Sequence, residues 1–264
     1  MKQLWSTVKC LSGPAVDWHL DDLRNHELRY LADLDLIAKL APTGKILEIG
    51  SAPCHMTALL QLSGYPTVGI DVNPARVAEI VNTLNLDVRQ CDIERSELPF
   101  PDGAFNCALL CETFEHMRVD PLFVMSEIRR VLALGAPLIL TTPNVYSLPS
   151  LARFLVGRSV ADPSEEFGKL RRMGHMGHVR EYSAGEMTRF LKVSGFEIQS
   201  LGFRHYRGRG WKRKILRAAY LLGPSKFQRD IVIVARKASA GVQLSPLADW
   251  VPALESSRMS NPQG

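Results

Sequence analysis

The sequence predicts an α/β protein in which a doubly wound, largely parallel sheet carries helices on both faces. Short, mainly apolar runs at 46–49, 67–71, 105–112 and 137–142 alternate with stretches of helical periodicity. Such runs are expected of parallel strands that are buried on both faces. The chain has 264 residues, 46% of them hydrophobic, which is enough to bury a substantial core. We therefore expect one globular α/β domain with additions.

The first 44 residues predict a helical cap in front of the sheet. Residues 17–40 carry an apolar stripe, and Pro42 and Gly44 end the helix before the first strand. Two interpretations remain open. The helix could close over a ligand, with Trp18, His19 and Tyr30 contributing, or it could simply cover the sheet.

The stretch 45–60 predicts a strand, a tight turn and a helix. The apolar run ends at Gly50, Ser51 to Pro53 follow, and Pro53 suits the first turn of the next helix. A strand that enters such a turn and leaves as a helix directs backbone N–H groups and a positive helix end at one point. This turn is therefore expected to bind a ligand with negative charge or many acceptors.

Two further strand ends carry carboxylates. Asp71 follows about 20 residues after the glycine turn, where an acidic side chain can accept hydrogen bonds from ribose hydroxyls. Asp92 ends a third predicted strand, 87–94. Together these ends predict a nucleoside-shaped crevice at the carboxyl edge of the sheet. Only Gly50 fits the first position of a G-x-G-x-x-G dinucleotide pattern.

The turn resembles the acidic-x-Gly-x-Gly-x-Gly pattern of class I S-adenosylmethionine (SAM) methyltransferases. Glu48 and Gly50 match it, whereas Ala52 and Cys54 replace the later glycines. The resemblance spans 45–237 and includes LPFPDGAFNCALLCETFEHM (98–117), EIRRVLALGAPLILTTPN (127–144) and HVREYSAGEMTRFLKVSGFEI (178–198). It is strongest to the small-molecule O-methyltransferase branch that contains ubiquinone-pathway and polysaccharide or glycan enzymes.

This resemblance implies a Rossmann-like, seven-stranded sheet whose last strand is antiparallel, and SAM as the cofactor. In the family, the side chain at the Asp92 position takes the adenine amino group, and Ile93 would pack on the ring. The cofactor residues that the resemblance implies are Glu48, Gly50, Ser51, Ala52, Asp71, Val72, Asp92, Ile93 and Cys111.

Two histidines are candidate general bases. His116 follows the strand 105–112 at the crevice, and an imidazole titrates near working pH. His116 could instead be a loop histidine bonded to a neighbour. His178 is the second candidate base, and its alternative is a residue of a solvated charged loop. The spacing His175-x-x-His178 has no further ligand cluster attached, so no metal is expected. The residues expected to contact the acceptor are Asn144, Tyr146, Arg180 and Tyr182.

Three segments lie outside the regular alternation. Residues 145–183, with one short helix near 148–156, predict a cationic substrate lid, or else a solvated loop. The insertion 203–228 holds seven Lys and Arg residues between 204 and 217, and subtracting them from the net charge of +5 leaves −2. Its stretch 204–222 could contact an anionic membrane or a phosphate-bearing substrate, or pack as an ordinary helix. The tail 238–264 is expected to be disordered.

Cysteine usage and the N-terminus predict a cytoplasmic location. The five cysteines lack paired metal spacing, and most fall in predicted buried strands or the turn, so we expect free thiols in a reducing compartment. The start MKQLWSTVKCLSG does not resemble a secretory signal. The oligomeric state is left open.

The sequence thus favours a SAM-dependent methyltransferase that acts on a hydroxyl of a small molecule such as a sugar, phenol, quinol or lipid-linked intermediate. The alternatives are a nucleic-acid methyltransferase and a non-catalytic SAM-binding protein. The basic composition and the GSAP turn suggest the nucleic-acid methyltransferase. The Lys-Asp-Lys-Glu set of 2′-O-ribose enzymes cannot be placed in this sequence, however, so a nucleic-acid substrate is not expected. The replacement of the two later glycines by Ala52 and Cys54 suggests the non-catalytic SAM-binding protein.

Overall fold

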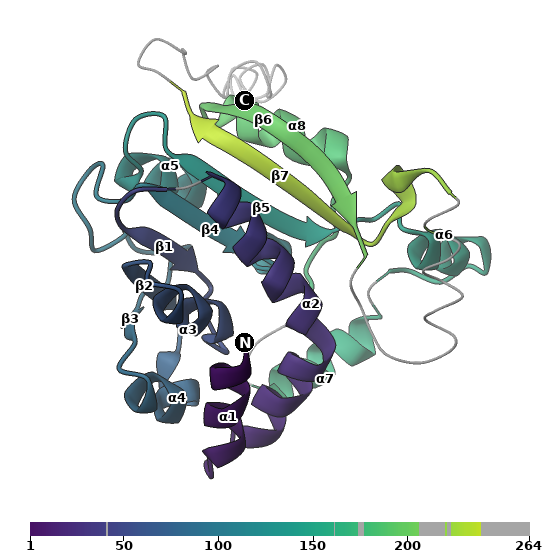
Figure 1. Ribbon diagram of the computed structural model, residues 1–264. Helices are drawn as coiled ribbons and strands as arrows, with labels where there is room; N and C mark the ends of the chain where they lie inside the picture. The colour runs from purple at the N-terminus through teal and green to yellow at the C-terminus, as the bar shows by residue number, and fades with distance from the viewer. Residues whose placement is uncertain (41, 161, 174–176, 206–219, 221–222, 239–264) are drawn as a thin grey trace, which may run out of the picture.

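The computed structural model confirms the predicted architecture (Figure 1). It describes residues 1–40, 42–160, 162–173, 177–205, 220 and 223–238. Seven strands form one sheet in the order β3-β2-β1-β4-β5-β7-β6, and β7 runs antiparallel to both of its neighbours. The strands are β1 (Ile46–Ile49), β2 (Thr67–Asp71), β3 (Asp87–Gln90), β4 (Cys107–Cys111), β5 (Pro137–Pro143), β6 (Phe196–Arg204) and β7 (Asp230–Lys237).

Helices cover both faces of this sheet. The helices of the described residues are α1 (Lys2–Cys10), α2 (Val16–Leu40), α3 (His55–Leu62), α4 (Ala78–Thr83), α5 (Pro121–Val131), α6 (Leu148–Leu155), α7 (Pro163–Met173) and α8 (Ala184–Val193). Those that contribute to the core on the sheet are α1 to α5 and α8. Short 3₁₀ turns are η1 (Pro74–Val77), η2 (Phe114–His116) and η3 (Ser225–Phe227). Of the helices that the structure describes, none is long and apolar enough to cross a bilayer.

Alternation along the central strands divides the core into two layers. Because successive strand residues point to opposite faces, Ile46 and Leu109 pack with α1, α2, α3 and α4, whereas Leu47 and Leu110 pack with α5 and α8. Figure 1 shows α2 lying across the first of these faces. The parallel strands β1, β2 and β4 all end at one edge, and the segments that follow them build the site.

Several sequence predictions need correction. The segment 145–183 contains a second helix, α7, in addition to the predicted one, and α1 was not expected. Pro53 lies in the turn before α3, which begins at His55. Most of the basic insertion and the whole tail, 206–219, 221–222 and 239–264, lie outside the described residues.

Arg204 does not belong to a surface patch. It ends β6, is 8% exposed and forms an ion pair with Asp33 of α2. The five cysteines are free thiols, as predicted, and Cys54, Cys91 and Cys107 are buried.

Candidate active site

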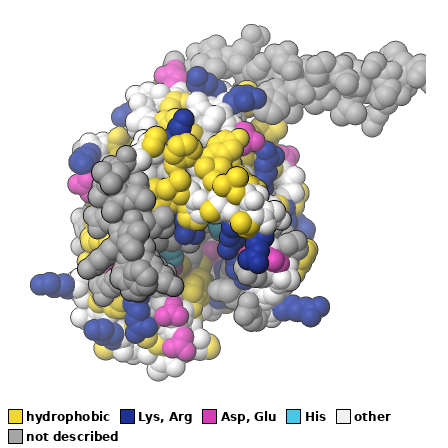
Figure 2. All heavy atoms as spheres, turned by 90° about the vertical axis from the view of Figure 1, so that its right-hand side faces the viewer, with side chains coloured by type: hydrophobic (Ala, Val, Ile, Leu, Met, Phe, Trp, Pro, Cys, Tyr) yellow, Lys and Arg dark blue, Asp and Glu magenta, His cyan; other side chains and the backbone are white. Residues whose placement is uncertain are grey.

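A cavity of about 650 Å³ opens at the carboxyl edge of the sheet, between the strand ends and α2. Figure 2 shows the molecule hollowed on the side that is at the right of Figure 1, with histidine atoms visible inside. The cavity is lined by both candidate bases and by every residue that the resemblance implies for the cofactor: Glu48, Gly50, Ser51, Ala52, Asp71, Val72, Asp92, Ile93, Cys111, His116 and His178.

The backbone N–H groups of the turn after β1 are bound by the protein itself. The N–H groups of Gly50 and Ser51 each donate to the carbonyl of Ile70 in β2, at 2.9 Å. Ala52 donates to the carboxylate of Asp71 at 3.2 Å, and Cys54 donates to the carbonyl of Ser51 at 2.6 Å. A pyrophosphate is normally bound by such groups. These four N–H groups are therefore not open to a ligand, so the turn would have to contact a cofactor through other atoms.

Gly50 is required by conformation and by space. Its φ is +70°, and a Cβ added there would lie 2.4 Å from Oγ1 of Thr113. The Thr113 hydroxyl donates to the carbonyl of Ile49 at 3.2 Å, which joins the ends of β4 and β1. Cys54 also adopts a left-handed φ of 65°, so the chain keeps a glycine-like conformation where the family pattern has glycine.

Asp71 is suited to accept one more hydrogen bond. Its carboxylate accepts from the N–H groups of Ala52 and Asn73 and from the guanidinium of Arg76, at 2.9–3.2 Å. A carboxylate offers about four acceptor positions, so the three donors leave one for a ligand hydroxyl. Asp92, by contrast, is partly exposed and accepts from the N–H of Glu94 at 3.2 Å, which closes a turn.

The side chain of Glu48 is buried inside the domain. It is 7% exposed, and Thr57 donates a hydrogen bond to its carboxyl group. Burial raises the pKa of Glu48 to about 8, because the charged form loses its hydration. At neutral pH in the free protein this group is therefore mostly protonated.

One face of α2 forms the opposite wall. Of the three residues that the sequence analysis offered for this helix, Trp18 and Tyr30 line the cavity and His19 does not, whereas a polar stripe of the same helix was missed. Asp22, His26, Arg29 and Asp33 recur at spacings of three and four residues and all line the cavity, as does Tyr30. The signal was present, because this spacing places side chains on one helix face beside the apolar stripe. Arg29 lies 3.5 Å from Oε2 of Glu112, which fixes the helix over the end of β4.

Hydrogen bonds also fasten α2 to the start of α3. Asp22 Oδ2 accepts from the Tyr30 hydroxyl at 2.6 Å and lies 2.9 Å from Nδ1 of His55. The other ring nitrogen of His55 lies 3.0 Å from Nδ1 of His19. Burial, together with the neighbouring His55, lowers the pKa of His19 to about 4, so this ring is neutral at neutral pH.

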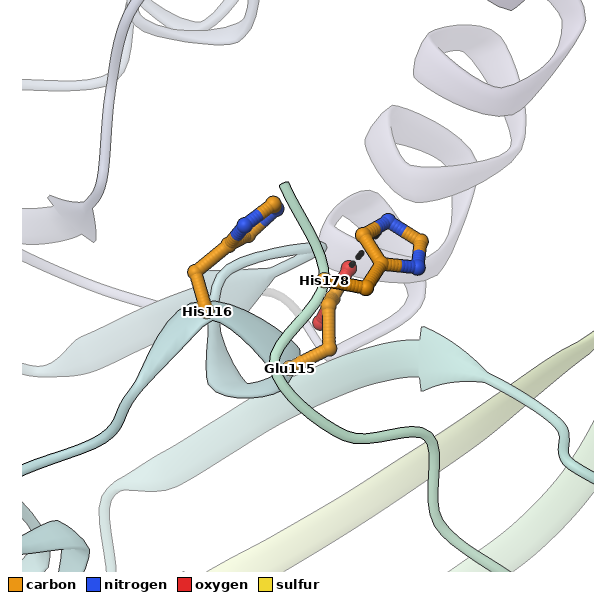
Figure 3. A group of neighbouring side chains, drawn as sticks. All are labelled: Glu115, His116 and His178. Atoms are coloured by element: carbon orange, nitrogen blue, oxygen red, sulfur yellow. Dashed lines mark ion pairs between the residues drawn. The ribbon is translucent and has the colours of Figure 1, made fainter. Parts of the chain in front are cut away.

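Both candidate bases lie close to the carboxyl group of Glu115 (Figure 3). The rings of His116 and His178 are edge to face, with centroids 5.1 Å apart. His116 Nδ1 lies 3.0 Å from the carbonyl of Gly177, so this nitrogen carries the proton and Nε2 carries the lone pair. His178 has a carboxyl oxygen near each nitrogen, Glu181 at 3.3 Å and Glu115 at 3.9 Å. The alternative given for His116, a histidine hydrogen-bonded to a neighbour, therefore also holds.

Glu115 is a buried acid that the sequence reasoning did not single out. Burial, and then the neighbouring Glu112, raise its pKa well above the usual value for a carboxyl group. Thr142 donates to its Oε2 at 3.0 Å, whereas Oε1 has no hydrogen-bond partner among the described residues. Its backbone carbonyl accepts from the N–H of Val179 at 2.8 Å, which holds the His178 segment against the cavity.

The same three groups are the nearest approach to a metal centre in the described part of the chain. One ligand atom from each of Glu115, His116 and His178 lies within 4.8 Å of the others. Ligand atoms about 2.1 Å from a tetrahedral zinc ion would be about 3.4 Å apart. The three groups would have to move closer together to bind a metal ion.

The four predicted acceptor-binding residues do not line the cavity. The amide of Asn144 is buried and donates to the carbonyls of Lys226 and Gln228, which ties β5 to the segment before β7. Arg180 pairs with Glu186 at the surface, and Tyr182 packs on Phe114. Tyr146 is 55% exposed. The contacts of Asn144, Arg180 and Tyr182 thus have structural roles outside the cavity.

Comparisons with known proteins identify the family of this chain. The family described as "Methyltransferase domain" matches residues 23–201. A probable S-adenosylmethionine-dependent methyltransferase of Mycolicibacterium smegmatis is 28% identical over 187 residues, 70% of this chain and 63% of that protein. A demethylmenaquinone methyltransferase of Thermus thermophilus is 31% identical over 130 residues, 45% of this chain and 58% of that protein. The chain thus spans about three fifths of the length of these curated relatives.

Solved structures show the same fold. A SAM-dependent methyltransferase from Archaeoglobus fulgidus superimposes with a TM-score of 0.58 at 17% identity, over 83% of this chain and 99% of that one. The family match covers more than half of the chain, and its region contains the whole cofactor-side wall of the cavity. The chain belongs to the methyltransferase domain family.

Proposed function

We propose that this protein transfers the methyl group of S-adenosylmethionine to a hydroxyl of a small-molecule acceptor, such as a sugar, a phenol or quinol, or a lipid-linked intermediate. The observation that carries the proposal is a single cavity lined by Asp71 and Asp92 at the nucleoside end and by His116 and His178 at the other. The residues expected to bind the cofactor and the candidate proton acceptors thus line the same cavity. The demethylmenaquinone enzyme among the relatives makes a quinol a natural first acceptor to test.

S-adenosylmethionine supplies an activated methyl group on a sulfonium, so the protein has to supply alignment and proton removal. The turn 50–54, Asp71 and Asp92 would hold the adenosine, leaving the reacting end toward η2. Alignment of this kind replaces a bimolecular encounter by an intramolecular one, which is a large share of the rate gain available to such an enzyme.

His116 is our candidate for the base. Its Nδ1–H donates to the Gly177 carbonyl, which fixes the tautomer in which Nε2 can accept a proton from the acceptor hydroxyl. His178, between the carboxyl groups of Glu181 and Glu115, is better suited to hold or orient that hydroxyl. Both roles require only groups that already face the cavity.

Two measurements test this function. Calorimetry should show SAM and adenosylhomocysteine binding, and a screen of phenolic, quinol, sugar and lipid-linked acceptors with tritiated methyl donor should identify a methylated product. Absence of SAM binding would contradict the proposal. Binding without transfer to any acceptor would favour a non-catalytic SAM-binding protein. RNA binding with a steep salt dependence would favour a nucleic-acid substrate instead.

A further inference from the structure

The end of α6 exposes three consecutive apolar side chains to solvent. Phe154 is 46% exposed, Leu155 88% and Val156 70%. Residues 152–159 are all exposed, so this stretch, which we call the α6 tip, protrudes from the domain. Figure 2 faces the side on which Figure 1 has α6 and shows hydrophobic side chains gathered there, above the hollow. Consecutive apolar residues this exposed on a surface usually mark an interaction site.

The tip is held in place at both ends. Ser147 caps the start of α6, and its hydroxyl lies 2.8 Å from that of Ser150, with both residues buried. Beyond the helix, Gly157 takes a φ of +71° and donates to the carbonyl of Phe154 at 3.0 Å. Arg158 N–H donates to the carbonyl of Arg153 at 2.9 Å. The apolar side chains are therefore presented by a closed helix end with its own hydrogen bonds.

The charges around the α6 tip indicate which kind of partner it would bind. Arg153 and Arg158 flank the apolar residues, both are exposed, and the sequence has no Asp or Glu from 137 to 161. A convex tip of three apolar side chains with a cationic rim matches the surface of an anionic bilayer. The acyl chains would contact the apolar side chains, and the anionic headgroups would contact the arginines. A protein partner would instead favour a larger and flatter surface with a central anchor.

The tip also lies on the cavity side of the molecule. The strand β5 ends at Pro143 at the same edge of the sheet as β1, β2 and β4, and the chain passes directly from there into α6. Asn144 forms a bridge with Tyr182, in the segment that also carries His178. A surface that binds the tip would therefore lie near the cavity.

We propose that the α6 tip, residues 153–158, docks on an anionic membrane surface. Leu155 and Val156 enter the boundary between headgroups and acyl chains, and Arg153 and Arg158 meet anionic headgroups. This inference rests on the exposed tip and its charge and does not depend on the methyl-transfer reaction.

The test is flotation of the full chain with phosphatidylcholine vesicles, with and without phosphatidylglycerol. We expect the wild type to float with the anionic vesicles and to be released by salt. Leu155→Glu should lower the partition coefficient at least tenfold, because an apolar side chain is removed and a like charge faces the lipid. The double variant Arg153→Gln/Arg158→Gln should lower it by about tenfold.

Leu134→Glu is the matched control. Leu134 is 67% exposed, but it lies between α5 and β5, at the opposite edge of the sheet from the cavity. Its variant should float like the wild type. All variants should keep the wild-type SAM affinity, so a failure of SAM binding would concern the function proposed above and leave this test intact.

Three outcomes would overturn the proposal. The wild type could fail to float with anionic vesicles, or Leu134→Glu could reduce flotation as much as Leu155→Glu does. Analytical ultracentrifugation gives the third: if Leu155→Glu converts an oligomer to a monomer and leaves flotation unchanged, the tip is a contact between two copies of the chain.

Discussion

The guanidinium of Arg204 forms a buried ion pair with Asp33, although 171 residues separate them along the chain. Asp33 lies in α2 and Arg204 ends β6, so the pair fastens the N-terminal helix to the far edge of the sheet. Asp33 also lines the cavity, and the pair therefore fixes the helix that forms one of its walls.

Removal of this carboxylate should destabilise the fold strongly. Asp33→Ala removes the carboxylate that pairs with this buried guanidinium, and a loss of about 3 kcal/mol of unfolding free energy is expected. Asp35→Ala is the control, since Asp35 pairs with Lys39 on the exposed side of the same helix, and about 0.5 kcal/mol is expected there. Urea denaturation of both variants measures the difference. Equal losses would show that the buried pair does not stabilise the cap.

Asp71 should control cofactor affinity. Asp71→Asn removes the charge that accepts from Ala52, Arg76 and, in our proposal, a ribose hydroxyl, so SAM binding should weaken at least tenfold, about 1.4 kcal/mol. Calorimetry with SAM measures this. Asp87→Asn, in the exposed pair with Arg89 outside the cavity, should keep the wild-type affinity. An unchanged affinity in Asp71→Asn would mean that the ribose binds elsewhere.

Glu48 should make the free protein less stable as pH rises. The unfolded chain releases this proton near pH 4.5, whereas burial holds it on the folded protein to about pH 8. Between these values the folded state binds one more proton, so stability falls with rising pH. In Glu48→Gln this loss is absent, and the variant should gain roughly 3 kcal/mol relative to wild type between pH 5 and 8. Chemical denaturation across this range measures the gain.

Glu127 provides a control of opposite sign. Hydrogen bonds from Arg130 and from the N–H of Leu98 lower the pKa of Glu127, so its contribution is present above pH 4.5 and is lost as acid is added. Glu127→Gln should therefore change the pH profile only on the acidic side. A flat difference between wild type and Glu48→Gln from pH 5 to 8 would contradict the buried, protonated state of Glu48.

The two histidines should differ in single-turnover methyl transfer. With the acceptor found by screening, His116→Ala should slow the chemical step about a hundredfold, because Nε2 of this ring is the proposed proton acceptor. His178→Ala should act mainly on acceptor affinity. His26→Ala, also in the cavity wall, is the control and should leave the chemical step unchanged. Full activity in both His116 and His178 variants would exclude a histidine base.

The sequence alone determined the sheet and the cofactor-side wall. Strand ends are local features: a β-branched run, a glycine turn and a following carboxylate can be read at Glu48, Gly50 and Asp71 without knowing the fold. All of the residues that the family resemblance implies for the cofactor line one cavity. The acceptor side was predicted less well, because Asn144 and Tyr182 contact distant segments and Arg180 pairs with Glu186 at the start of α8.

Only the tertiary structure decided between the two interpretations of the N-terminal helix and revealed the buried charges. The pairing of Asp33 with Arg204, the contact of Arg29 with Glu112 and the buried acid Glu115 all depend on which surfaces the helices cover. Polar spacing along α2 reveals one face of a helix but not what that face meets. Packing between segments far apart in the sequence decides whether a carboxyl group is solvated, paired or protonated, and local sequence patterns carry no information about that packing.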